Sequence, residues 1–121
     1  MNNNIDYGKK GEYLVARHLE QQGFSIIARN YRKPYGEVDL IARKRNELTF
    51  VEVKMRRNPL VDPATVITTR KQRSIGMVVK EYLASHNMYD TMTARCDVAL
   101  VIQSATGPTI QYIDHAFTID D

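Results

Sequence analysis

The sequence has a single cysteine, Cys96, among its 121 residues. One thiol excludes an internal disulfide framework and any zinc site built from several cysteines, and it suits a reducing compartment. Long apolar runs are absent as well, since the longest, residues 98–102, is far below the roughly 20 residues that span a bilayer. The first six residues also lack the apolar stretch of a secretory signal. These absences predict a soluble cytoplasmic protein that contacts no membrane.

Glycine, serine and proline do not gather into a linker, and no internal repeat or low-complexity segment divides the chain. With 43% hydrophobic and 26% charged residues, the composition excludes a disordered, collagen-like or coiled-coil chain. A chain of this length buries roughly two-thirds of its unfolded surface when it folds. We therefore expect one domain over residues 1–121.

The charge balance is mildly basic, with 17 lysines and arginines against 14 aspartates and glutamates. The resulting net charge of +3 permits nucleic-acid binding without requiring it. Most of the cations lie in the middle of the chain, whereas the carboxyl end is acidic. If the fold collects these cations on one face, that face would attract phosphate; the alternative is a solvated surface of mixed charge.

Periodicity and turn residues predict seven elements. We expect a helix over residues 7–22, strands over 24–31, 37–43 and 48–54, a helix from Thr69 to near Asn87, and strands over 95–103 and 109–113. Residues 55–68 should form an irregular connection, and Thr69 with Gln72 resembles a capping box. The order α-β-β-β-α-β-β predicts an α/β fold in which one sheet carries packed helices.

The second and third strands form a hairpin in which acids interrupt the apolar pattern. Alternation sends Val38 and Leu40 to one face and Asp39 and Ile41 to the other. With the turn centred between positions 45 and 46, the numbers of opposed residues sum to 91, so Asp39 falls opposite Glu52. Opposed side chains on antiparallel strands start about 4.5–5.5 Å apart, and like charges at that spacing are destabilising.

Such a pair of carboxylates requires a counter-charge. Lys54 supplies one, because it shares a strand face with Glu52, and a divalent cation would supply a better one. Mg²⁺ accepts one or two carboxylates and retains several waters, which suits metal-assisted phosphodiester hydrolysis. Asp39, Glu52 and the carbonyl of Val53 would then be the ligands, and Lys54 would stabilise developing negative charge. The alternative is an exposed hairpin with an ordinary Glu–Lys pair.

Three further polar residues sit in apolar patterns. Glu12 lies on the apolar stripe of the first helix, where it either meets a binding partner or is a partly exposed acid near the helix amino end. Gln72 either reaches the site or caps the second helix. For Asp97 we expect a structural salt link to Arg95 or Arg29.

A series of short motifs resembles the YraN family over nearly the whole chain. They are Gly11-Glu12, Arg29-Asn30-Tyr31-Arg32, Gly36-Glu37-Val38-Asp39-Leu40-Ile41, Phe50-Val51-Glu52-Val53-Lys54, Lys71-Gln72-Arg73 and Arg95-Cys96-Asp97-Val98. This bacterial family is uncharacterised and is similar to restriction-endonuclease-like nucleases and archaeal Holliday junction resolvases. The resemblance implies a restriction-endonuclease-like core, α-β-β-β-α-β, with a mixed sheet flanked by helices. It also implies an Asp…Glu-x-Lys motif at Asp39, Glu52 and Lys54, with Glu12 as an accessory acid.

Our leading hypothesis is a nuclease that uses Mg²⁺ or Mn²⁺ to hydrolyse phosphodiester bonds in DNA, at branched or otherwise structured sites. Cations near the site are expected to bind phosphate, namely Arg56, Arg57, Arg70, Lys71 and Arg73. The alternatives are a non-catalytic nucleic-acid-binding module that retains the nuclease scaffold, and a protein-interaction role with structural acids. A homodimer is favoured only by analogy with resolvases that cut two strands.

Overall fold

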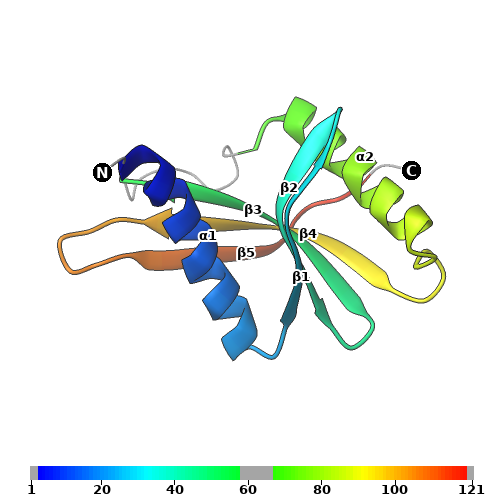
Figure 1. Cartoon of the computed structure of the whole chain (residues 1–121), viewed down its shortest axis with the longest axis horizontal. Helices are drawn as coiled ribbons and strands as arrows, with labels where there is room; N and C mark the ends of the chain where they lie inside the picture. Colours follow the sequence, from blue (N-terminus) through cyan, green and yellow to red (C-terminus); the bar gives the residue numbers. More distant parts are fainter. Residues whose placement is uncertain (1–2, 58–66, 120–121) are drawn as a thin grey trace.

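The computed structural model describes residues 3–57 and 67–119, and its elements follow the predicted order. They are α1 (Asn3–Gln21), β1 (Ser25–Lys33), β2 (Gly36–Lys44), β3 (Glu47–Arg56), α2 (Thr69–Ser85), β4 (Thr93–Ile102) and β5 (Thr109–Phe117) (Figure 1). The predicted α/β class is confirmed, and the arrangement is compatible with a restriction-endonuclease-like core. Neither helix within the described ranges is long and apolar enough to cross a membrane.

The five strands form one mixed sheet in the order β1-β2-β3-β4-β5. The pairs β1–β2, β2–β3 and β4–β5 are antiparallel, whereas β3 and β4 are parallel over their whole length. A parallel neighbour requires a long crossover connection, and α2 lies within the segment that makes it. The crossover therefore includes α2, whose first turn returns to β3, where Lys71 contacts Glu52.

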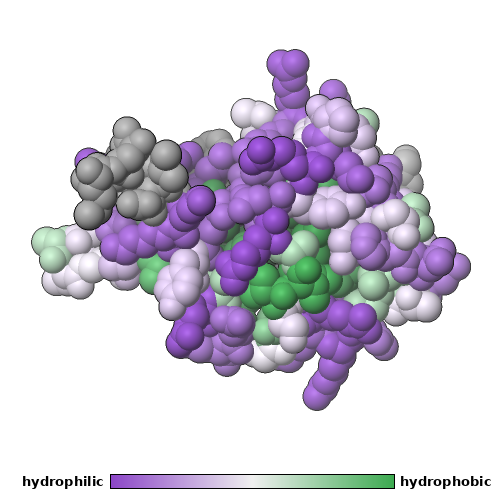
Figure 2. All heavy atoms as spheres, viewed as in Figure 1, coloured by the Kyte–Doolittle hydropathy of each residue, from purple (hydrophilic) through white to green (hydrophobic). Residues whose placement is uncertain are grey.

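The two helices cover opposite faces of the sheet (Figure 1). Phe50 of β3 belongs to the apolar cluster under α2, and the next residue, Val51, belongs to the cluster under α1. In β4 the same alternation sends Val98 towards α2 and Ala99 towards α1. Both faces of β4 are thus buried, as its nearly continuous apolar sequence predicts. Hydrophilic side chains cover most of the face drawn in Figure 2.

The predicted register of the β2–β3 hairpin is confirmed. Residue numbers sum to 91 at every recorded pair from Lys44 opposite Glu47 to Leu40 opposite Val51, where the ladder ends. The first helix begins at Asn3, four residues before its predicted start, and ends at Gln21, one residue before its predicted end. Gly23 follows it with φ +92°, a backbone conformation that favours glycine.

The predicted alternation is wrong at Val38. This residue packs under α2 together with Ile41, whereas Leu40 packs under α1. The neighbouring strand explains the change, because Asn30 of β1 has a left-handed backbone with φ +51°. β1 also changes register with respect to β2 before that residue. These irregularities coil the β1–β2 hairpin towards α2.

The amino end of α2 differs from the predicted capping box by one residue. Thr68, not Thr69, is the N-cap, and its hydroxyl oxygen accepts from the backbone N–H of Lys71 at 3.1 Å. The side-chain amide of Gln72 donates to the carbonyl of Ile67 at 3.2 Å. Both interactions satisfy backbone groups at the helix start.

All five strands are longer than predicted, and β5 extends furthest past its predicted end. β3 continues through Met55 and Arg56, where an irregular connection was expected; residues 58–66 of that connection lie outside the described residues. β5 continues beyond position 113 to Phe117, whose side chain packs against the cluster under α2.

Asp97 is a fully buried carboxylate in β4 with a complete set of donors. Its Oδ2 accepts from Thr49 Oγ1 at 2.6 Å, from Arg95 Nε at 3.0 Å and from the hydroxyl of Tyr112. Its Oδ1 accepts from the backbone N–H of His115 at 3.0 Å. The expected salt link to Arg95 is therefore confirmed, and it ties β3, β4 and β5 together.

We expect Asp97→Ala to lower the free energy of unfolding by about 3–5 kcal/mol, because it leaves the buried donors, including a charged guanidinium, without an acceptor. Urea denaturation measures this change. Asp114→Ala, which removes an exposed carboxylate from β5, is the matched control and should stay within about 0.5 kcal/mol of wild type. A loss below about 1 kcal/mol for Asp97→Ala would contradict the structural role of the network.

Candidate active site

The candidate site lies where β2 separates from β3. Asp39 is the residue of β2 just beyond the last recorded pair of the ladder, and its Oδ2 accepts from the backbone N–H of Val53 at 2.8 Å. The side chain thus takes a donor that a strand carbonyl would otherwise take. Because the N–H and C=O of one strand residue point to the same side, the carbonyl of Val53 is also directed towards Asp39.

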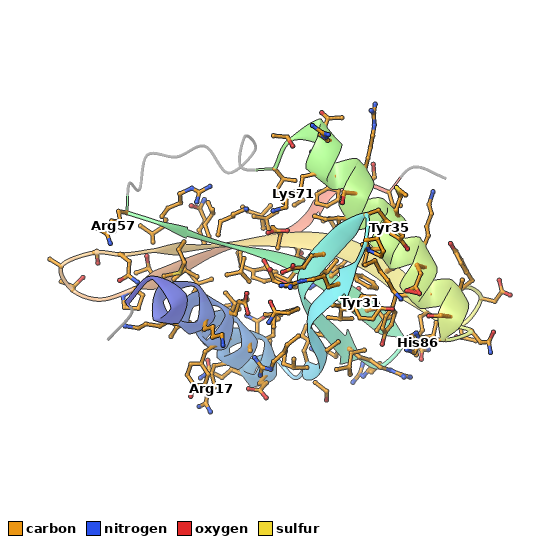
Figure 3. The ribbon with its side chains drawn as sticks, turned by 45° about the horizontal axis from the view of Figure 1, so that its top comes forward. Arg17, Tyr31, Tyr35, Arg57, Lys71 and His86 are labelled. Atoms are coloured by element: carbon orange, nitrogen blue, oxygen red, sulfur yellow. The ribbon has the colours of Figure 1, made fainter. Side chains whose placement is uncertain are left out.

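Glu52 brings a second carboxylate to this position from the face covered by α2. Its side chain is only 6% exposed, and Oε1 contacts two ammonium groups. Lys71 Nζ lies at 3.0 Å and Lys54 Nζ at 3.5 Å. Strand alternation predicts the contact with Lys54, but Lys71 comes from the start of α2 (Figure 3). Lys71 was expected only as a phosphate-binding residue, and no sequence spacing would have placed it against Glu52.

The two carboxylates are close enough to change the protonation of Asp39. Burial raises the pKa of Asp39 from 3.8 to about 7, and the charge of Glu52 and a side-chain hydrogen bond with it add to the rise. Glu12 raises this pKa further through its charge, whereas the N–H of Val53 opposes the rise. Near neutral pH the carboxyl group of Asp39 is therefore protonated in a large part of the molecules.

The neighbouring lysine is shifted in the opposite direction. Burial lowers the pKa of Lys54, and the nearby ammonium of Lys71 lowers it further, whereas Glu52 opposes the shift. A partly desolvated ammonium interacts strongly with any negative charge that forms beside it. Lys54 is thus placed to respond to developing charge.

Glu12 approaches from α1, on the other face of the sheet. Its Oε1 accepts from the side-chain amide of Asn30 at 3.3 Å. Asn30 is a residue that sequence reasoning missed, although asparagine tolerates the left-handed backbone better than most residues do. Because the β2–β3 ladder opens here, Glu12 and Glu52 influence Asp39 from opposite faces.

The oxygen donors fit a hard divalent cation. Mg²⁺ prefers oxygen ligands and binds through one or two carboxylates while it retains several waters. Asp39, Glu52 and the carbonyl of Val53 form such a set, and the mutual repulsion of the two carboxylates would be relieved by a cation. Within residues 3–57 and 67–119 no group of three or more His, Cys, Asp or Glu side chains is placed to hold a metal ion, so a cation here would be bound by two carboxylates, a carbonyl and water. Two carboxylates and a carbonyl are oxygen ligands of the kind that Mg²⁺ or Mn²⁺ prefers, whereas zinc sites more often contain nitrogen or sulfur ligands.

The hydrogen bond of the Gln72 side chain is to the helix start and not to Asp39 or Glu52. Its amide bonds to the carbonyl of Ile67, and its side chain lines a hollow of about 310 Å³ beside Arg73 and the segment after β5. Of the two alternatives for Gln72, the structure supports a role at the helix start.

The five cations that were predicted to bind phosphate do not all lie beside the carboxylates. Arg70 and Lys71 line a cleft beside the candidate site, whereas Arg73 lines the hollow described above. The guanidinium of Arg56 donates to the carbonyl of Met55 at 2.8 Å. Arg57 lies at the end of β3, on the same side of the molecule as Lys71 (Figure 3).

We expect Asp39→Asn to raise the metal-free stability of the protein at pH 8 by about 2–4 kcal/mol. An acid with a raised folded-state pKa contributes its full stability below its unfolded pKa, near 3.8, and loses that stability progressively as the pH rises from there to about 7. Asparagine keeps the oxygen that accepts from Val53 and removes the charge. The advantage of the variant should therefore shrink as the pH falls towards 4. Denaturant titrations in EDTA across this range measure it.

Asp90→Asn removes an exposed carboxylate beyond α2 and should show no comparable gain. If Asp39→Asn is less stable than wild type at pH 8, the carboxylate pair is a stabilising element of the fold and not a site held under electrostatic repulsion.

Comparison with known proteins identifies the family of this chain. The sequence model described as "Uncharacterised protein family UPF0102" matches residues 11–101. A UPF0102 protein of Rhodococcus opacus (strain B4) is 40% identical over 97% of this chain and 100% of its own length. A UPF0102 protein of Syntrophus aciditrophicus (strain SB) is 37% identical over 98% of this chain and 94% of its own length. Another, of Treponema pallidum (strain Nichols), is 39% identical over 91% of this chain and 90% of its own length. The chain belongs to the UPF0102 family, which is the YraN family that its motifs resemble.

Proposed function

We propose that this protein is a metal-dependent nuclease that hydrolyses phosphodiester bonds in DNA. One observation carries the proposal: two carboxylates, Asp39 and Glu52, are held together although burial, and then their proximity, raise the pKa of Asp39 to about 7. Two lysines lie beside them. A fold gains no stability from such an arrangement, whereas a bound cation and a phosphate ester would both make use of it.

The carboxylates of Asp39 and Glu52 and the carbonyl of Val53 would hold Mg²⁺ or Mn²⁺. When bound, the cation polarises the phosphoryl oxygen and lowers the pKa of the attacking water. Lys71 holds the Glu52 carboxylate in place through its 3.0 Å contact, so that the orientation of Glu52 does not depend on the cation alone.

Lys54 supplies the electrostatic part of catalysis. Its ammonium lies 3.5 Å from Glu52 and is partly desolvated, so it can stabilise the negative charge that develops on the phosphoryl oxygens. Glu12, oriented by the amide of Asn30, provides a further acceptor beside Asp39 for a proton of the attacking water.

The proposal of a nucleic-acid substrate rests on charge and on the chemistry of the site. Arg57 and Lys71 lie on one side of the molecule, and Arg70 lines a cleft together with Lys71 (Figure 3). Cations that flank a carboxylate site on one side suit a polyanion that crosses it. A protein that binds nucleic acid without cleaving it would use the same cations, so only a cleavage assay separates the two functions.

We expect Mn²⁺-dependent cleavage in a screen of single-stranded, duplex, flap and four-way-junction DNA, and loss of that cleavage in Asp39→Asn. Lys54→Met should lower the single-turnover rate by about 10²–10³-fold and leave DNA affinity nearly unchanged, because its interaction forms mainly in the transition state. Lys44→Met removes a lysine from the opposite end of β2 and is the matched control, with activity close to wild type.

Thermal melts separate a failed metal site from an unsuitable substrate. At ten times its dissociation constant, Mn²⁺ should stabilise wild type by about 1.4 kcal/mol, roughly 4–6 °C, and should not stabilise Asp39→Asn. If Mn²⁺ stabilises both proteins equally and no substrate is cut, the nuclease proposal is wrong. Unchanged cleavage by Lys54→Met would refute the role of that lysine alone.

The cations beside the site should contribute to the salt dependence of DNA binding. Binding to duplex DNA in EDTA should weaken with a log–log slope of about 0.9 per phosphate contact, so the double variant Arg57→Gln, Arg70→Gln should reduce the slope by about two. The charge-matched control is Arg17→Gln, Lys44→Gln, since Arg17 lies below α1 on the opposite side of the molecule (Figure 3). Equal slopes for the two double variants would remove Arg57 and Arg70 from the interface.

A further inference from the structure

A cleft of about 500 Å³ opens between the tip of the β1–β2 hairpin and the start of α2. Tyr35 lines it from the hairpin tip, and Arg70 and Lys71 line it from the helix. The cleft adjoins the carboxylates, because the same Lys71 contacts Glu52 at 3.0 Å. Its volume lies within the range of small-molecule binding pockets, so it can hold a group as large as one nucleotide.

The walls of the cleft are fixed by close packing. A Cβ on Gly36 would lie 2.2 Å from Ser74 Oγ and 3.0 Å from the Ser74 carbonyl, so only glycine lets the hairpin approach the helix this closely. The Ser74 hydroxyl donates to the backbone carbonyl of Tyr35 at 2.5 Å. This hydrogen bond holds the Tyr35 backbone and leaves its side chain 39% exposed at the cleft.

The chemistry of the cleft combines an aromatic ring with positive charge. Arg70 and Lys71 provide two cations, and the one acid that lines the cleft, Glu37, is paired with Arg32 at 2.7 Å. Buried Ile75 adds an apolar surface. Aromatic rings stack on bases of any sequence, and adjacent cations bind the backbone phosphate.

We propose that this cleft binds one unpaired nucleotide next to the scissile phosphate, with its base on Tyr35 and its phosphate on Arg70 and Lys71. The inference rests on the proposed nuclease function and narrows it to substrates with an unpaired nucleotide at the cut. In a duplex both faces of a base are covered by stacked neighbours, so Tyr35 could not reach one. A single strand, a flap or the open centre of a branched substrate presents such a face.

The test is binding without cleavage, measured by fluorescence anisotropy in EDTA. The probes are a labelled thymidine oligonucleotide and a blunt duplex with the same number of phosphates per strand. Tyr35→Leu should weaken binding of the single strand by about 5- to 150-fold, the loss expected for one base–aromatic stack. Binding of the duplex should change less than twofold. Tyr35→Phe retains the ring and should bind both probes as wild type does.

Tyr89→Leu is the matched control, because Tyr89 is 52% exposed beyond the opposite end of α2 and should not contribute. The side chain of Tyr35 makes no recorded hydrogen bond, so its replacement should leave the melting temperature within a few degrees of wild type. The proposal is overturned if Tyr35→Leu affects both probes equally, if it affects neither, or if wild type does not bind the single strand. A selective loss with Tyr35→Leu supports it even if no DNA is cut, in which case the nuclease proposal fails separately.

Discussion

The repulsion between two carboxylates at the point where β2 leaves β3 is the constraint on which this structure depends. Asp39 ends the β2–β3 ladder by taking the backbone N–H of Val53, and this position sets it against Glu52. Neither acid can move away, since Asp39 is tied to β3 and Glu52 is held under α2 by Lys71. The surroundings reduce the repulsion in two ways: two lysines contribute positive charge, and the pKa of Asp39 rises to about 7.

Asp97 shows what a structural acid looks like in the same sheet. It is fully buried, yet four donors from β3, β4 and β5, one of them the backbone N–H of His115, complete its coordination. Asp39 accepts a single recorded backbone donor and lies near two other acids. Both acids interrupt an apolar strand in the sequence, so burial alone does not separate them. The difference lies in how completely each charge is compensated, and by that measure only Asp39 needs a further positive partner.

The sequence predicts the part of the site that depends on local geometry. The hairpin register follows from a two-residue turn and strand alternation, and this places Asp39, Glu52 and Lys54 together. The same argument is wrong at Val38, because the left-handed backbone of Asn30 lies in the neighbouring strand and leaves no signal in the β2 sequence. Lys71 and Tyr35 could not be placed either. The contact of Lys71 with Glu52 depends on how α2 docks on the sheet, and the position of Tyr35 beside Lys71 depends on the close approach that Gly36 permits. Both are long-range contacts.

The arrangement of charge also explains why the two lysines are not equivalent. Lys71 comes from α2 and contacts Glu52 at 3.0 Å, so its position depends on helix packing and it fixes the carboxylate from outside the strand. Lys54 belongs to β3 itself, lies 3.5 Å from the same oxygen, and has a lowered pKa because burial and Lys71 both disfavour its charge.

A cation bound by Asp39 and Glu52 would displace the proton that Asp39 holds near neutral pH, since metal ligands bind in their deprotonated form. The carboxylates would then satisfy the cation, and Lys54 would be left as the less completely paired ammonium. Under the proposed function, the scissile phosphate would supply the missing negative charge, and this is why Lys54 rather than Lys71 is expected to stabilise the charge that develops there.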